Sequence, residues 1–188
     1  MPNLEKIKEK ILEDIGEKRF KHSLRVADTA KSLAKIHGAD ENKAYLAGLI
    51  HDCSKYNEKS YSEKLNIDPK NYGLKSYKDP VFHSFLGRDV AKKVYNISDE
   101  DILKAIAYHT TGRPNMSLLE KIIFVADAVE PKRDFEGLDK LRALSKTDID
   151  QAVLALLNNN IIYLIGKSLA INPLTIDARN FLIEEKNE

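Results

Sequence analysis

The stretch Leu49-Ile50-His51-Asp52 is the feature around which the rest of this chain is best interpreted: an apolar run ends in a histidine and an aspartate. A neutral imidazole and a carboxylate are both good ligands for divalent transition metals. A His-Asp pair alone also occurs as an ordinary hydrogen-bonded surface feature, so it gains meaning only from the other residues. His51 lies two helical turns after Ala44, which predicts that it belongs to the buried face of its helix.

Further candidate ligands occur along the chain, each at or near a predicted helix with apolar neighbours: His22, His83, His109 and Asp127, the last directly after the apolar run 122–126. His37, beside Gly38, instead resembles an ordinary helix-terminal histidine. Burying one unpaired polar group costs about 1–3 kcal/mol, and a shared metal removes several such costs together. Imidazoles and carboxylates without a set of thiolates indicate iron, manganese, cobalt or zinc rather than a structural zinc site. The six residues suffice for two metals that share Asp52.

Composition limits the class of protein. The chain has 188 residues, 43% of them hydrophobic, and a net charge of +1. This length suits one domain, or one domain with a small appendage, and the charge argues against a broad nucleic-acid surface. The lysine- and glutamate-rich start has no signal-peptide core, and no segment approaches the ~20 apolar residues of a membrane span. We therefore expect a cytoplasmic protein without membrane or nucleic-acid partners; a homodimer is left open.

Cys53, the only cysteine, follows Asp52 directly. It cannot form an internal disulfide, which agrees with a reducing compartment. A free cysteine usually packs as a small hydrophobe, although a catalytic or ligand thiol remains an alternative at this position.

Apolar periodicity and capping residues predict an all-α chain without repeats or linkers. The expected helices are 4–15 (cap Asn3, stop Gly16), 17–37, 41–53 (cap Asp40), 61–66, 80–95 (start Asp79-Pro80), 98–109 (capping box Ser98 and Asp101), 117–127 (capping box Ser117 and Glu120), 138–144, 147–170 (start Thr147 and Asp150) and 173–185. We expect a single domain over 1–188, with a core of about 17–145 on which the C-terminal helices 147–186 pack.

The segment 54–79 breaks the helical pattern. It mixes four tyrosines with asparagine, glycine and proline. A polar, tyrosine-rich loop directly after a proposed metal ligand is a common place for substrate contacts. A surface excursion without a functional role explains the same composition equally well.

The order of His22, His51-Asp52 and Asp127 resembles the H…HD…D ligands of the HD-domain metal-dependent phosphohydrolases, and His83 with His109 matches the two further histidines of their two-metal branch. Four longer strings resemble the bacterial YqeK family, the HD-type symmetrical diadenosine tetraphosphate hydrolases: RFKHSLRV at 19–26, HDCSK at 51–55, YHTTGR at 108–113 and ADAVEPKRD at 126–134. The resemblance implies an HD-domain helical bundle. It also implies one or two divalent metals, iron first, with manganese, cobalt or zinc as alternatives.

The activity implied by the resemblance is the hydrolysis of diadenosine tetraphosphate to two ADP. His22, His51, Asp52 and Asp127 would ligate one metal, and His83 and His109 a second. A divalent metal lowers the pKa of bound water to roughly 7, so that metal-bound hydroxide attacks phosphorus. Asp52, Lys55 and Arg133 are the candidate catalytic residues, with Arg133 as a phosphate clamp unless it pairs with Asp134 or Glu130. The candidate substrate-binding residues are Thr110, Thr111, Gly112, Arg113 and Arg133.

Two other functions remain open at this stage. One is an HD phosphohydrolase acting on a different compound, such as a deoxynucleoside triphosphate, a cyclic dinucleotide, guanosine tetraphosphate or a pyridine-nucleotide derivative. The other is a non-catalytic metal or nucleotide sensor. Lys55 and Arg133 beside the ligands argue against a sensor of metal alone, because such a sensor needs no phosphate clamp. The role of Arg25, one turn from His22, is undecided.

Overall fold

Nine α-helices and one short 3-10 helix form the regular structure of residues 3–185, the part of the chain that this computed structural model describes, and no strand occurs there. The elements are α1 (Leu4–His37), α2 (Glu41–Ile50), α3 (Glu58–Leu65), η1 (Pro69–Tyr72), α4 (Phe82–Lys93), α5 (Glu100–Tyr108), α6 (Leu118–Val129), α7 (Leu138–Thr147), α8 (Ile149–Gly166) and α9 (Pro173–Glu184). The prediction of an all-α fold is confirmed. The ends of the predicted domain, 1–2 and 186–188, lie outside the described residues.

The two helices predicted before and after Gly16 form one long, kinked helix, α1. Gly16 has φ +74° and ψ 163°, a non-helical conformation that a residue with a side chain rarely adopts. Asn3 caps the start by accepting from the backbone N–H groups of Glu5 and Lys6, and Gly38 ends the helix in the left-handed conformation. The sequence therefore located both the break and the ends.

Some predicted boundaries were wrong because a neighbouring side chain provides the cap. Asp99, rather than the pair Ser98 and Asp101, accepts from two backbone N–H groups at the start of α5. Asp148, rather than Thr147, caps α8, whereas the predicted start of α9 at Pro173 is confirmed, with Asn172 as its cap. The capping box of Ser117 and Glu120 on α6 is confirmed.

Other differences lie around the tyrosine-rich segment. The helix predicted for 41–53 ends at Ile50 and is followed by turns, α3 begins three residues before the predicted Tyr61, and η1 was not predicted. The helix expected from Asp79-Pro80 begins at Phe82, because Asp79 accepts from the Val81 N–H within a turn. Apart from the additional η1, each difference moves a boundary without changing the order of the helices.

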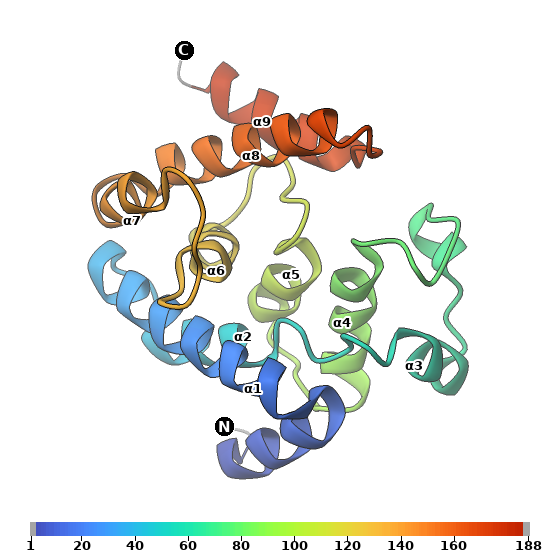
Figure 1. Cartoon of the computed structure of the whole chain (residues 1–188). Helices are drawn as coiled ribbons and strands as arrows, with labels where there is room; N and C mark the ends of the chain where they lie inside the picture. The colour runs from blue at the N-terminus through green and yellow to red at the C-terminus, as the bar shows by residue number, and fades with distance from the viewer. Residues whose placement is uncertain (1–2, 186–188) are drawn as a thin grey trace.

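The core bundle consists of α1, α2, α4, α5 and α6. The central helix α2 packs against α1, α5 and α6, while α4 packs against α5. Helix α1 approaches α2 very closely: a Cβ at Gly48 would lie 2.9 Å from the Ala27 Cα, so only glycine fits there. Figure 1 shows α3 and η1 beside α4, and α7 to α9 at another side of the bundle. The C-terminal end of α2 is thereby placed among the other core helices.

Helix α8 packs against α6, α7 and α9 through its first half, where Ala152, Val153, Leu156 and Leu157 are buried. Its second half is exposed: Ile162, Tyr163 and Ile165 are each 60–68% accessible. By length and composition, this is one helix among residues 3–185 that could cross a membrane, and 28% of it is buried. The sequence analysis did not single out residues 149–166, in which positions 150, 151 and 158–160 are polar.

Candidate metal centre and its cavities

Each of the five core helices contributes to one cluster of side chains. His22 lies on α1, His51-Asp52 directly follow α2, His83 lies on α4, His109 directly follows α5 and Asp127 lies on α6. The four histidines and Asp52 are buried, with at most 6% of each residue accessible. The structure therefore brings all six predicted ligands together from distant parts of the chain.

Asp52 lies between two groups of histidines. Its Oδ2 is 3.2 Å from His51 Nε2, and its Oδ1 is 3.3 Å from His83 Nε2 and 3.7 Å from His109 Nε2. One potential metal-binding group contains His22, His51 and Asp52; the other contains Asp52, His83 and His109. Asp127 Oδ1 adds to the first group, 3.0 Å from His22 Nε2 and 3.9 Å from His51 Nε2.

The outer nitrogens of three histidines fix the orientation of their rings. His51 Nδ1 and His109 Nδ1 each lie 2.7 Å from a backbone carbonyl three residues earlier, and His22 Nδ1 lies 3.1 Å from Glu130 Oε1. Donation from Nδ1 to these acceptors leaves the Nε2 lone pair directed at the cluster, as metal ligation requires. His83 differs, because its Nδ1 lies 2.9 Å from Lys55 Nζ.

The chemistry of the cluster fits a metal. Half of the six buried side-chain atoms that lack a hydrogen-bond partner within residues 3–185 belong to this cluster: His22 Nε2, His51 Nε2 and Asp52 Oδ1. Burial, with His51 nearby, lowers the pKa of His109 to about 4, and burial next to His109 lowers the pKa of His83 well below its usual value. Burial alone would raise the pKa of Asp52, but His51, His83 and His109 lower it. Burial alone would lower the pKa of His51, but Asp52 and Asp127 raise it. The shifts of His83, His109 and Asp52 favour the neutral imidazoles and ionised carboxylate that a divalent ion needs.

Arg19 is a site residue that the sequence analysis missed. Its Nε and one terminal guanidinium nitrogen both lie against Asp52 Oδ2. Arg19 precedes His22 by three residues on α1, so helical spacing places the two side chains on one face. This three-residue spacing from His22 is the feature of the sequence that could have identified Arg19 as a site residue.

Arg25, whose role the sequence left open, pairs with Glu130. Its Nε lies 2.6 Å from Glu130 Oε2, and a terminal nitrogen lies 3.1 Å from Oε1. Glu130 also accepts from the Lys132 N–H and contacts His22. Burial alone would raise the pKa of Glu130, but the hydrogen bond from Arg25 contributes to lowering it to about 2. Arg25 therefore holds the carboxylate that orients His22.

Arg133 contacts Asp127 rather than the predicted partners Asp134 or Glu130. A terminal nitrogen lies 2.6 Å from Asp127 Oδ1, and its Nε donates to the Asp127 carbonyl at 2.8 Å. The side chain remains 37% accessible. Arg133 thus lies at the edge of the cluster with part of its guanidinium facing solvent.

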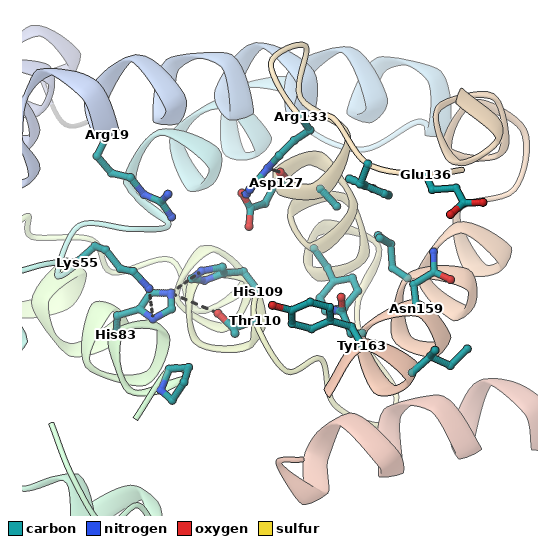
Figure 2. A pocket seen from close by; sticks show the side chains of 17 residues that line it. Arg19, Lys55, His83, His109, Thr110, Asp127, Arg133, Glu136, Asn159 and Tyr163 are labelled. Carbon is teal, nitrogen blue, oxygen red and sulfur yellow. Dashed lines mark hydrogen bonds and ion pairs between the residues drawn. The ribbon is translucent and has the colours of Figure 1, made fainter. Parts of the chain in front are cut away.

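A cavity of about 810 Å³ opens beside the cluster. Figure 2 shows Arg19, Lys55 and His83 on one side of it, with Arg133 above and Tyr163 and Asn159 opposite. The cavity is lined by Arg19, Lys55, Pro80, His83, His109, Thr110, Phe124, Asp127, Ala128, Arg133, Phe135, Glu136, Leu156, Asn159, Asn160, Ile162 and Tyr163. It therefore joins cations near the cluster to aromatic and amide side chains of α8 and the segment before α7.

Only part of the predicted phosphate-binding turn reaches this cavity. Thr110 lines it, whereas Thr111 is buried and donates to the Gly112 carbonyl. Arg113 turns away and forms two 2.6 Å hydrogen bonds with the buried Glu120. Gly112 has φ +66° and does not line the cavity; a Cβ added to it would lie against Ala178 and Leu157. The assignments of Thr111, Gly112 and Arg113 to substrate binding are therefore not supported by their positions.

Cys53 is fully buried behind the cluster, where its thiol lies 3.4 Å from the Gly87 carbonyl. Burial raises the pKa of this thiol, so it stays protonated. A protonated thiol facing a carbonyl fits the packing role and not the ligand or nucleophile role.

Comparison with known proteins agrees with this geometry. The HD domain family matches residues 19–132. A Halalkalibacterium halodurans protein named symmetrical bis(5'-nucleosyl)-tetraphosphatase is 42% identical over 92% of both chains, and a Staphylococcus aureus protein of the same name is 38% identical over 95% of this chain and 94% of its own. This chain belongs to the HD domain family. A crystal structure of a predicted HD superfamily hydrolase involved in NAD metabolism, from Clostridium acetobutylicum, superposes with a TM-score of 0.86 at 43% identity, covering 98% of this HD-domain chain and 99% of the other.

Proposed function

We propose that this protein hydrolyses diadenosine tetraphosphate symmetrically, consuming one water molecule and releasing two ADP. The observation that carries the proposal is the large cavity, because it is lined by the His/Asp cluster and by cations at one end and by aromatic and amide side chains at the other. The names of the relatives, at 42% and 38% identity over nearly the whole chain, support this substrate.

The cations near the cluster suit a polyphosphate. Arg19, Lys55 and Arg133 all line the cavity within reach of the ligands. Arginine can bind phosphate oxygens through two parallel donors, whereas lysine provides a compact point charge. We assign Arg133 to the bound phosphate chain and Lys55 to the charge that develops on the departing ADP.

The opposite wall suits an adenosine. Tyr163 and Phe135 are 60% and 38% accessible and provide faces on which a base can stack. Asn159 and Asn160 line the same wall, and their amides can both donate to and accept from the edge of a base. Because Tyr163 and Ile162 both line the cavity, this exposed part of α8 has a use in substrate binding, which supports a cytoplasmic protein.

The metal would be held by His22, His51, Asp52 and Asp127, and a second ion by Asp52, His83 and His109. Iron is the first choice, with manganese, cobalt or zinc as alternatives. When bound, a divalent metal supplies Lewis acidity toward phosphoryl oxygens and lowers the pKa of bound water to roughly 7. Glu130 and Arg25 keep His22 in the ligating orientation.

The test is product analysis after incubation with diadenosine tetraphosphate and each candidate metal, following chelator treatment. We expect ADP as the sole nucleotide product, and in oxygen-18 water one label in one of the two ADP molecules. ATP and AMP in equal amounts would contradict symmetric cleavage. The protein is incubated in parallel with a deoxynucleoside triphosphate, a cyclic dinucleotide and guanosine tetraphosphate. Hydrolysis of one of these compounds in place of diadenosine tetraphosphate would indicate a different phosphohydrolase activity. No hydrolysis with any metal would favour the sensor.

A further inference from the structure

A second, smaller cavity lies beside the metal cluster. It has a volume of about 310 Å³, at the lower end of the range of ligand pockets, roughly 300–1,000 Å³. Its lining includes Arg19, His22, Arg25 and Tyr56. Arg19 lines both cavities, and His22 is one of the proposed ligands. The two cavities therefore lie on either side of Arg19, and each is lined by one or more proposed metal ligands.

Tyr56 gives this cavity an aromatic face. The side chain is 69% accessible, although it directly follows Lys55 in the segment after the His51-Asp52 pair. An aromatic ring left in solvent beside cationic side chains is typical of a surface that stacks a base next to a phosphate. The cavity thus combines the same two kinds of group as the larger one, on a smaller scale.

The backbone at Tyr56 is strained. Tyr56 has φ +71°, whereas three of the other four non-glycine residues with positive φ within residues 3–185 are asparagines, which adopt this conformation more easily. A bulky residue in the left-handed region indicates that the structure retains the side chain for another reason.

The neighbourhood holds Tyr56 in place. Asp14, just before the Gly16 kink, accepts from Tyr61 at 2.6 Å and from Tyr95 at 2.5 Å, and its carbonyl accepts from the Asn57 side chain. These bonds fix the residues that follow Tyr56 against the kinked end of α1, whose residues 15–19 form one wall of the cavity. The cavity is therefore formed before any ligand binds, which lowers the entropy cost of binding.

A substrate that is cleaved symmetrically extends from the cluster on both sides. The broken bond lies at the centre of diadenosine tetraphosphate, so a nucleoside and two phosphates must extend from the cluster in each of two directions. The large cavity receives one half. We infer that the small cavity receives the second nucleoside, with its base stacked on Tyr56 and its phosphates near Arg19. This inference rests on the proposed function and names the site of the other half of the substrate.

The test compares two substrates. Diadenosine tetraphosphate has a nucleoside at each end and is called the two-headed substrate; adenosine 5'-tetraphosphate has only one nucleoside and is called the single-headed substrate. Tyr56→Gly removes the ring and relieves the positive φ. We expect kcat/KM to fall roughly 5- to 100-fold with the two-headed substrate, the range for loss of one stacked base, and to stay within about 2-fold with the single-headed one. The melting temperature should rise by about 2–4 °C as the strain is removed.

Three further variants complete the design. Tyr56→Phe keeps the stacking face, so both substrates should react within about 2-fold of the wild-type rate. Tyr163→Ala, in the large cavity, should impair both substrates. Tyr77→Ala, an accessible tyrosine of the same loop that lines neither cavity, should impair neither. Calorimetry with a centrally methylene-bridged, non-hydrolysable diadenosine tetraphosphate should show the same loss in affinity for Tyr56→Gly.

An equal loss on both substrates, or no loss on either, would overturn the inference while leaving the proposed function intact. Wild-type protein that hydrolyses the single-headed but not the two-headed compound would overturn the proposed function and the inference with it. Selective loss with the two-headed compound, in a protein of raised melting temperature, supports the second nucleoside site.

Discussion

The large and small cavities share Arg19 and are both lined by ligands of the same cluster, but they are formed in different ways. The large one takes its walls from α1, α4, α6 and α8, which are far apart in the sequence, whereas the small one is lined by residues 15–25 of α1 and by Tyr56. The small cavity therefore depends on one local kink and one loop residue. The large cavity depends on the docking of α8 onto α6, α7 and α9.

The cluster between the cavities should carry the largest effect. In His51→Ala and Asp127→Ala proteins, metal content should fall to near zero, and turnover of both the two-headed and single-headed substrates should fall by at least about 10²-fold. Elemental analysis of the purified, folded variants measures the first effect independently of activity. Full wild-type metal content in both variants would mean that the ligand assignment is wrong.

Arg133 belongs to the large cavity alone, so its loss should affect both substrates. Arg133→Ala should lower turnover roughly 10²-fold, by analogy with the loss of one preorganised donor. Arg133→Lys should recover part of this loss, because the charge is kept while the bidentate contact is not. The matched control is Arg179→Ala, which also removes a guanidinium. Arg179 binds Asn158 and lines neither cavity, so this variant should keep its turnover. Unchanged turnover in Arg133→Ala would remove the phosphate clamp from the mechanism.

Arg113 lines neither of the two cavities at the cluster and should affect stability rather than turnover. Arg113→Ala leaves the buried Glu120 carboxylate without its partner, which should cost about 3 kcal/mol of unfolding free energy. Chemical denaturation measures this loss, and kcat/KM for both substrates should stay close to wild type. A specific loss of kcat/KM without loss of stability would return Arg113 to the substrate site.

Cys53, behind the cluster and outside both cavities, should have the smallest effect. Cys53→Ala should reduce the unfolding free energy by about 1 kcal/mol through lost packing. Metal content and turnover should remain nearly unchanged, since the thiol faces the Gly87 carbonyl. A large drop in turnover in the folded variant would restore a chemical role for the thiol.

The sequence by itself determined the residue types of the metal centre and the helices that carry them. His51 and Asp127 both follow apolar runs, and the spacing of His51 from Ala44 predicted that His51 lies on a buried face, which the structure confirms. The Gly16 break and the caps at Asn3, Asp40 and Ser117 also followed from local rules, because a cap bonds to backbone groups two or three residues away. Such short-range interactions can be derived without knowledge of the fold.

Only the tertiary structure decided which cations reach the cluster and that a second cavity exists. Arg113 lies near His109 in sequence, yet the turn at Gly112 directs its side chain to Glu120. Arg19, in contrast, contacts Asp52, which lies 33 residues later in the sequence. The direction of a side chain after a turn depends on backbone dihedrals and on the partner it finds, and neither is encoded in spacing. Likewise, Tyr56 lines a cavity only because Asp14 holds the loop against the kink of α1. Long-range contacts of this kind arise from packing, so the sequence pattern could not reveal them.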